Sequence, residues 1–177
     1  INLFTGEVKH IDPLINELNN LLSDFNEEPR EINVINSIRG DYYRFTGEFV
    51  KAISIYKLLE KPYQNDKSYH QLSAIYTTIG NCYYYLNKTD SALHFYQEAI
   101  DCKPPEINII GTARVYNNIG SIHRSRSEFE KALDNFFKSV ELKAQLNDSI
   151  GVAITHMNIS TVYRAMGNHE KAIEYNR

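Results

Sequence analysis

Arginine recurs in this chain at spacings that are multiples of 40 residues, at Arg44, Arg124 and Arg164. A guanidinium group keeps its positive charge, and its planar fork of N–H donors matches a carboxylate or a phosphate. Asn81 and Asn117 add side-chain amides, which donate and accept hydrogen bonds together and therefore suit a peptide backbone. These residue types offer recognition of a polar or anionic chain.

Residue sets that make or break bonds are not evident. The six histidines show no metal-ligand spacing with carboxylates or cysteines, and Cys82 and Cys102 are interpreted as reduced residues of the core or its boundary. No glycine-rich phosphate loop and no serine-nucleophile motif occurs. We therefore predict no catalytic residue, no metal and no cofactor, and a protein that is not an enzyme.

The bulk properties are those of a globular protein. The chain has 177 residues, of which 42% are hydrophobic, and a net charge of -3, which gives no reason to expect nucleic acid or an anionic membrane as partner. No apolar run approaches the roughly 20 residues that a membrane-spanning helix needs. The compartment is left open, with a cytoplasmic location favoured. Because the chain begins at Ile1 and ends inside an expected helix, we expect it to be a fragment.

The elements that position these residues repeat every 40 residues. A column of small residues comprises Gly40, Gly80, Gly120 and Ser160. Three residues after each of these stand Tyr43, Tyr83, His123 and Tyr163, and twelve residues after each stand Ala52, Ala92, Ala132 and Ala172. Sixteen residues after stand Tyr56, Tyr96, Phe136 and, breaking the pattern, Asn176. A fixed period of this length indicates a stacked helical repeat protein.

Each repeat is expected to be a pair of helices. Apolar residues at helical spacing predict a helix at about 29–45 and a partner that begins near residue 48 and fades at residues 60–62. The array then divides into about 29–66, 67–105, 106–148 and a truncated 149–177, and residues 1–28 form a capping or degenerate-repeat helix. The turns within the pairs share one position that favours a left-handed backbone, occupied by Gly47, Asn87, Ser127 and Gly167.

The small-residue column has a packing reason. A glycine in a helix interior costs about 1 kcal/mol relative to alanine, which is tolerable where its absent side chain lets the partner helix come close. The alanine column is the expected counterpart on that partner, with the aromatic columns around the contact. Ser160 and Asn176 depart from both columns, so we expect the fourth repeat to be the most loosely packed.

At this point the sequence resembles the tetratricopeptide repeat family. The resemblance covers about residues 33–177 and is carried by the segments Tyr116 to Gly120, Gly47 to Ala52 and Met166 to Ile173. It implies an all-α fold, a right-handed α-solenoid of stacked antiparallel helix pairs. The 40-residue period exceeds the family's commonest period of about 34 residues, and is similar to the long repeats of peptide-sensing bacterial regulators, kinesin light chains and spindle adaptors.

The resemblance also implies a binding surface. In the family, the face of each first helix that lies opposite the glycine column lines a concave groove. The expected groove residues are Arg44, Asn81, Tyr84, Tyr85, Arg114, Asn117, Arg124 and Arg164. Four arginines and few acids on this face suggest an extended peptide or partner segment with acidic character, although solvated arginines, or arginines paired with acids of neighbouring helices, are the alternative interpretation.

The expected function is a non-catalytic scaffold that binds a protein or peptide, as the sensor or assembly region of a larger bacterial regulator. We expect no nucleic acid bound by this segment and no membrane span within it. The alternatives are a structural spacer or self-association segment and a eukaryotic-type adaptor. In the self-association reading, Ala172 and Ile173 at the open end of the last repeat pair with another copy to form a homo-oligomer.

Overall fold

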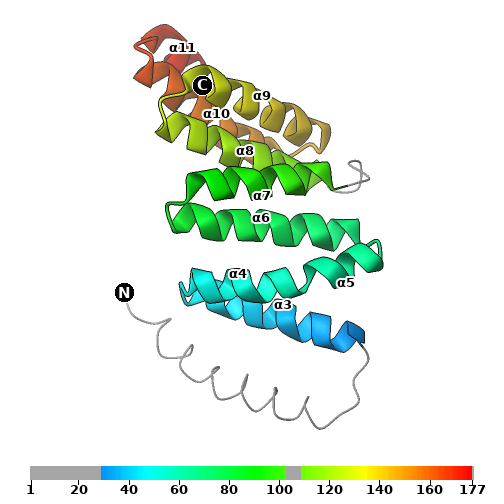
Figure 1. The fold of residues 1–177 in the computed structure, drawn as a ribbon. Coiled ribbons are helices and arrows are strands. Elements are labelled where there is room, and N and C mark those ends of the chain that lie inside the picture. The colour runs from blue at the N-terminus through cyan, green and yellow to red at the C-terminus, as the bar shows by residue number, and fades with distance from the viewer. Residues whose placement is uncertain (1–28, 103–108, 177) are drawn as a thin grey trace, which may run out of the picture. The chain divides into compact units, whose positions relative to one another are not determined.

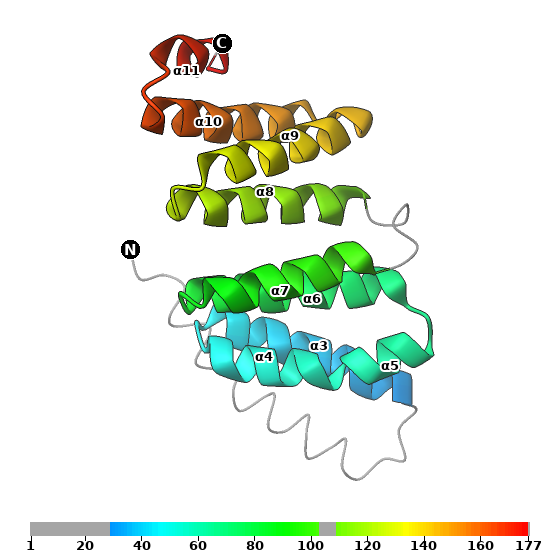
Figure 2. The same cartoon turned by 45° about the horizontal axis from the view of Figure 1, so that its top comes forward.

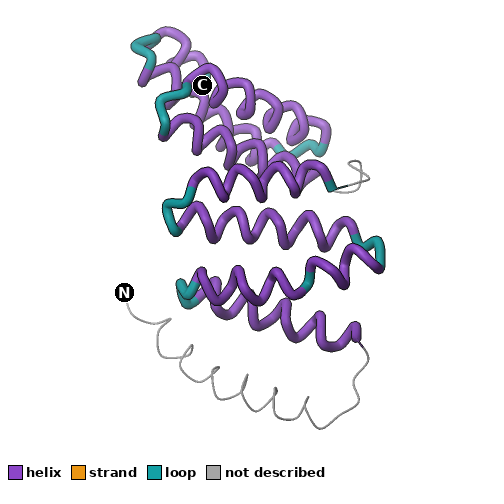
Figure 3. Tube along the Cα trace, in the orientation of Figure 1, coloured by secondary structure: helices purple, strands orange, loops and turns teal. Residues whose placement is uncertain are grey.

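The computed structural model describes residues 29–102 and 109–176, and these residues form helices and short turns with no strand (Figure 1; Figure 3). The helix expected within residues 1–28 lies outside the described residues. The chain divides into two compact units, the first ending at Asp66 and the second beginning at Lys67, and each unit is described by itself. The all-α repeat fold expected from the sequence is confirmed.

The first helices of the pairs follow the 40-residue period residue for residue. They are α3 (Pro29–Phe45) in the first unit, and α6 (Tyr69–Tyr85), α8 (Ile109–Ser125) and α10 (Ser149–Ala165) in the second. Each has 17 residues. The glycine column therefore lies at the same depth inside each helix, and the residues around it keep the same facing from pair to pair.

The turns after these helices are also equivalent. Gly47, Asn87, Ser127 and Gly167 all have a positive φ, between 57° and 80°. The next residue closes the helix end with a backbone hydrogen bond to a carbonyl of the last turn, such as Lys88 N to Tyr83 O at 2.9 Å. This left-handed helix ending suits glycine and asparagine, whereas Ser127 adopts it against its own steric preference.

The second helices differ in length. They are α4 (Phe49–Leu58) with the short α5 (Glu60–Asn65) in the first unit, and α7 (Thr89–Asp101), α9 (Phe129–Gln145) and α11 (His169–Glu174) in the second. The end expected at residues 60–62 lies close to the observed end of α4 at Leu58, but the separate helix α5, which was not expected, carries the chain on to Asn65. Pro62 lies in the first turn of α5, where a backbone N–H has no helical partner and proline is tolerated. Part of the additional length of the long repeats thus lies in their second helices.

An aromatic ring, not the alanine side chain, fills the space above each glycine. A Cβ atom added to Gly80 would lie 2.6 Å from the Tyr96 ring, and one added to Gly120 would lie 2.8 Å from the Phe136 ring. The backbone of the alanine column follows next, with Ala132 O at 3.1 Å from the position of the added Gly120 atom. The glycine and aromatic columns are therefore a matched pair.

The fourth pair solves the same packing problem differently. The Ser160 hydroxyl donates to Ala172 O at 2.8 Å, so the side chain that replaces glycine is itself hydrogen-bonded. Tyr175, one residue before the aromatic column, stacks on Tyr163 with ring centroids 5.6 Å apart. Ala172 is buried, so its expected exposure at the open end is wrong, whereas Ile173 is exposed. Looser packing of this pair stays a prediction.

The second unit is a stack in which each helix from α6 to α11 contacts the next (Figure 2). The first helices also meet one another directly, α6 against α8 and α8 against α10. Their outward sides thus form one continuous surface. None of the helices in the described ranges is long and apolar enough to cross a membrane.

Candidate binding face on the first helices

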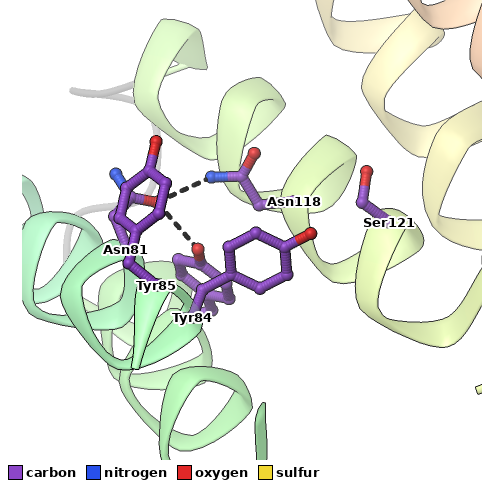
Figure 4. Close-up of a pocket in the computed structure, with 6 residues that line it drawn as sticks. Asn81, Tyr84, Tyr85, Asn118 and Ser121 are labelled. Atoms are coloured by element: carbon purple, nitrogen blue, oxygen red, sulfur yellow. Dashed lines mark hydrogen bonds between the residues drawn. The ribbon is translucent and has the colours of Figure 1, made fainter. Parts of the chain in front are cut away.

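The Asn81 side chain is fixed by two neighbours at the junction of α6 and α8. Its Oδ1 accepts a hydrogen bond from the Tyr96 hydroxyl at 2.7 Å and another from Asn118 Nδ2 at 3.0 Å (Figure 4). Tyr96 is the residue whose ring covers Gly80. One buried side chain therefore packs the repeat with its ring and orients Asn81 with its hydroxyl.

This arrangement leaves polar groups open to a ligand. Because Asn81 Oδ1 receives both hydrogen bonds, the Nδ2 donors of Asn81 remain, and so does Oδ1 of Asn118. Neither group bonds to another residue in the described part of the chain. Asn81 and Asn118 together thus present one donor group and one acceptor group.

The junction of α8 and α10 repeats the pattern. Asn158 Nδ2 donates to Asn117 Oδ1 at 3.0 Å, which leaves Asn117 Nδ2 and Asn158 Oδ1 without partners among residues 29–102 and 109–176. We call the surface of α6, α8 and α10 that carries the two pairs the amide face. It is defined by Asn81, Asn117, Asn118 and Asn158.

A hollow of about 150 Å³ lies on the amide face between α6 and α8. Its lining comprises Asn81, Tyr84, Tyr85, Tyr96, Asn118 and Ser121. Figure 4 shows the Tyr84 and Tyr85 rings on the α6 side and Ser121 on the α8 side. Tyr84 and Tyr85 are 41% and 66% exposed, so they offer apolar ring faces beside the open amide groups.

Burial keeps Tyr96, which donates a hydrogen bond to Asn81, in its neutral form. The pKa of Tyr96 is raised well above its ordinary value because burial disfavours the phenolate. Tyr96 therefore remains a hydrogen-bond donor to Asn81 at any physiological pH. Tyr56, the equivalent residue of the first unit, donates to Asp41 Oδ1 at 2.8 Å, and burial followed by the Asp41 carboxylate raises its pKa in the same direction.

The predicted arginines fall into two groups. In the first unit, Arg44 Nη2 lies 3.1 Å from Asp41 Oδ1 and its guanidinium covers the Phe45 ring at 4.3 Å from the centroid, so its charge is already partnered. In the second unit, no carboxylate of the described residues forms an ion pair with Arg114, Arg124 or Arg164. These three arginines belong to the helices of the amide face and carry positive charge there.

The sequence prediction located most of this surface but missed two of its members. Asn81, Tyr84 and Tyr85 line the hollow, and Asn117 lies in the second amide pair. Asn118 and Asn158 were left out, although a position two residues before the small-residue column also faces this way at about 100° per residue. Including that position among the expected groove residues would have predicted both Asn118 and Asn158.

The histidine and cysteine side chains of the described residues are relevant to the sequence predictions for metal and nucleophile sites. Among the described residues, no cluster of three or more histidine, cysteine, aspartate or glutamate side chains could hold a metal ion. Cys82 is buried, and burial with Glu98 and Asp101 nearby raises the pKa of Cys102 to about 11, which makes a poor nucleophile. His123 Nδ1 lies 2.8 Å from Glu128 Oε2, a contact that fixes the start of α9.

Comparison with protein families agrees with the helix pairs. Two models described as "Tetratricopeptide repeat" match residues 67–105 and 111–177. The chain belongs to the tetratricopeptide repeat family. The repeats support a protein-binding scaffold. No curated protein matches the sequence.

Solved structures with a similar fold include BtubC (BKLC) from P. vanneervenii, with a TM-score of 0.81 and 20% identity over 97% of this chain and 71% of that one. RapI in its apo form has a TM-score of 0.81 and 20% identity over 93% of this chain. The Rap conjugation gene regulator of plasmid pLS20, solved with the Phr* peptide, has a TM-score of 0.73 and 20% identity over 97% of this chain. The chain spans 46% and 47% of these two Rap proteins.

Proposed function

We propose that the second unit binds an extended segment of a peptide or protein along the amide face. The observation that carries this proposal is the pair of asparagine contacts, each of which leaves one donor and one acceptor open. An extended chain presents its own N–H and C=O groups at a rise of about 3.3 Å per residue. Asn81 with Asn118, and Asn117 with Asn158, can each hold one such backbone unit without reading its sequence.

The side chains around the amide pairs select the kind of segment. Arg114, Arg124 and Arg164 supply positive charge without a carboxylate partner in the described ranges, and they favour acidic residues in the ligand. Tyr84, Tyr85, Ile154 and Met157 are large side chains that remain exposed on the same helices. Apolar side chains of the ligand can be buried against them.

The wider role follows by analogy of fold. We infer that this array is the sensor or assembly region of a larger regulatory protein. The similarity to a Rap regulator solved with a peptide supports a peptide as the ligand, at the level of fold alone. A bacterial regulator is the favoured context, since the array matches two Rap proteins over about half of their length.

Panning a library of random 12-residue peptides against the immobilised chain tests the proposal. We expect acidic peptides to be retained by the chain and to be lost when Asn81 and Asn117 are both changed to alanine. Asn135→Ala is the matched control, because Asn135 lies on α9 and its amide donates to Lys131 O of the same helix. Retention of the same peptides by the double variant would overturn the proposal.

A second pair of variants tests the charge preference. The triple change to glutamate of Arg114, Arg124 and Arg164 should abolish capture of acidic peptides. Lys131, Lys138 and Lys171 changed together to glutamate alter the net charge equally but lie on α9 and α11. Equal loss of peptide capture by both triple variants would mean that net charge alone explains the effect. A concentration-dependent dimer that retains no peptide would favour the self-association alternative.

A further inference from the structure

A second hollow, of about 240 Å³, lies where α8 and α10 begin and α9 ends. Its walls are partly aliphatic and include Ile110, Leu146, Ile150 and Ile154, which are 36% to 76% exposed. Arg114 and Ile154 line this hollow and also belong to the helices of the amide face, so the two sites adjoin. We call it the Lys143 pocket after the one lysine in its lining.

Lys143 is a buried cation with neutral partners. Its side chain is 8% exposed, and Nζ donates to Thr155 Oγ1 at 2.7 Å and to Gly151 O at 3.2 Å. No carboxylate of the described residues lies within ion-pair distance of Nζ. An ammonium group has three N–H donors, so one remains for a further acceptor.

The Asp148 carboxylate already caps the start of α10. Asp148 also lines the pocket, but its Oδ1 accepts the backbone N–H of Gly151 at 2.8 Å and caps the start of α10. A buried charge without a counter-ion is costly, and burial lowers the pKa of Lys143 accordingly. Among the described residues, no carboxylate therefore forms an ion pair with Lys143 inside the pocket.

We propose that the Lys143 pocket takes a glutamate side chain of the segment bound on the amide face. A glutamate has a methylene stem that fits aliphatic walls and a carboxylate at its tip that reaches the third donor of Lys143. One side chain thus satisfies both features of the pocket, and Arg114, which also lines it, adds a second positive charge. This inference rests on the proposed function and specifies its ligand.

The test uses peptides from the random 12-residue library retained by the whole chain. We expect a glutamate at one fixed position among them, and Glu→Gln at that position should weaken binding to the unaltered chain roughly tenfold to hundredfold, the range of a hydrogen bond to a charged group. Lys143→Met keeps the stem and should abolish the difference between the Glu and Gln peptides. Lys138→Met, an exposed lysine of α9, should keep it.

The outcomes separate this inference from the proposed function. If peptides are retained through Asn81 and Asn117 but Lys143→Met leaves the Glu preference intact, the pocket is not the glutamate site and the amide face still stands. A required free C-terminal carboxylate next to an aliphatic residue would replace glutamate as the occupant and overturn the inference. Because the Glu→Gln comparison uses the unaltered chain, poor folding of the lysine variant does not remove the test.

Discussion

Buried tyrosines at the aromatic column have two functions at the scale of single residues. The rings of Tyr56 and Tyr96 occupy the space above Gly40 and Gly80, and their hydroxyls hold Asp41 and Asn81. Phe136 has the ring without the hydroxyl, which shows that packing alone does not require the phenol. The tyrosine hydroxyl of the second repeat therefore serves the orientation of Asn81.

The match between glycine and ring predicts a coupling between Gly120 and Phe136. Gly120→Ala should lower the free energy of unfolding by up to about 2 kcal/mol, because overpacking costs about 1–3 kcal/mol and the gain in helix propensity offsets about 1 kcal/mol. The loss should at least halve in a Phe136→Leu background, which frees space for the added methyl. Chemical denaturation of the four chains of this double-mutant cycle gives the comparison, and equal losses in both backgrounds would contradict the account.

Lys143 predicts a pH dependence of stability. Burial, and then the positive charge of Arg114, lower the pKa of Lys143, while Asp148 opposes them. Between this lowered pKa and the ordinary value of 10.5, the unfolded chain binds more protons than the folded one. Stability contributed by this group therefore rises as the pH increases through that window.

Denaturation of the unaltered chain and of Lys143→Met at pH 7 to 10.5 isolates this contribution. As the pH rises, the free energy of unfolding of the unaltered chain should increase relative to that of Lys143→Met. The same comparison with Lys138→Met should show no such increase, because the hydrogen bond to Asp134 raises the pKa of Lys138 instead of lowering it. If the free energy of unfolding of the unaltered chain stayed constant or fell relative to that of Lys143→Met as the pH rises, the pKa of Lys143 would not be lowered in the folded chain.

At the scale of the elements, the turns make one residue stand out. Ser127 adopts a φ of 59° where the equivalent residues are glycine or asparagine. Ser127→Gly should stabilise the chain by about 1 kcal/mol, because a side chain in the left-handed region costs about 1–2 kcal/mol and glycine avoids this. Ser54→Gly, in the exposed interior of α4, should destabilise instead. Thermal denaturation followed by circular dichroism compares them, and the same sign for both would contradict the assigned turn geometry.

The repeat period explains which elements could be predicted from the sequence. The columns built on Gly40, Gly80 and Gly120 locate the first helices because local spacing decides which side of a helix is buried. The continuation through α5 could not be predicted in this way, because Pro62 resembles a stop signal and is acceptable only once a new helix begins two residues before it. The period therefore predicts helices better than it predicts their ends.

The candidate site was predictable in part for the same reason. Helical geometry places Asn81, Asn117 and the tyrosines on one face. It gives no information on contacts between helices. The hydrogen bonds from Tyr96 to Asn81 and from Asn158 to Asn117 therefore had no sequence signal. Lys143 was equally hidden, because its burial depends on Thr155 of the next helix.

At the scale of the whole molecule, the binding surface that we propose is made by repetition. Three first helices of the second unit meet directly, and each junction contributes one asparagine pair. Binding through such pairs holds the ligand backbone, and the surrounding arginines and the Lys143 pocket then select acidic side chains. Both features predict that capture of an acidic peptide weakens as the salt concentration rises, by an amount that falls when the arginines are removed.

The central claim is that the open amide groups hold the backbone of an extended segment. Nuclear magnetic resonance of the side-chain NH₂ signals during titration with a peptide retained from the library tests it most directly. We expect the signals of Asn81 and Asn117 to shift with saturation, that of Asn135 to stay unchanged, and Tyr96→Phe to weaken the response of Asn81. Saturable peptide binding that leaves the Asn81 and Asn117 signals in place would contradict it.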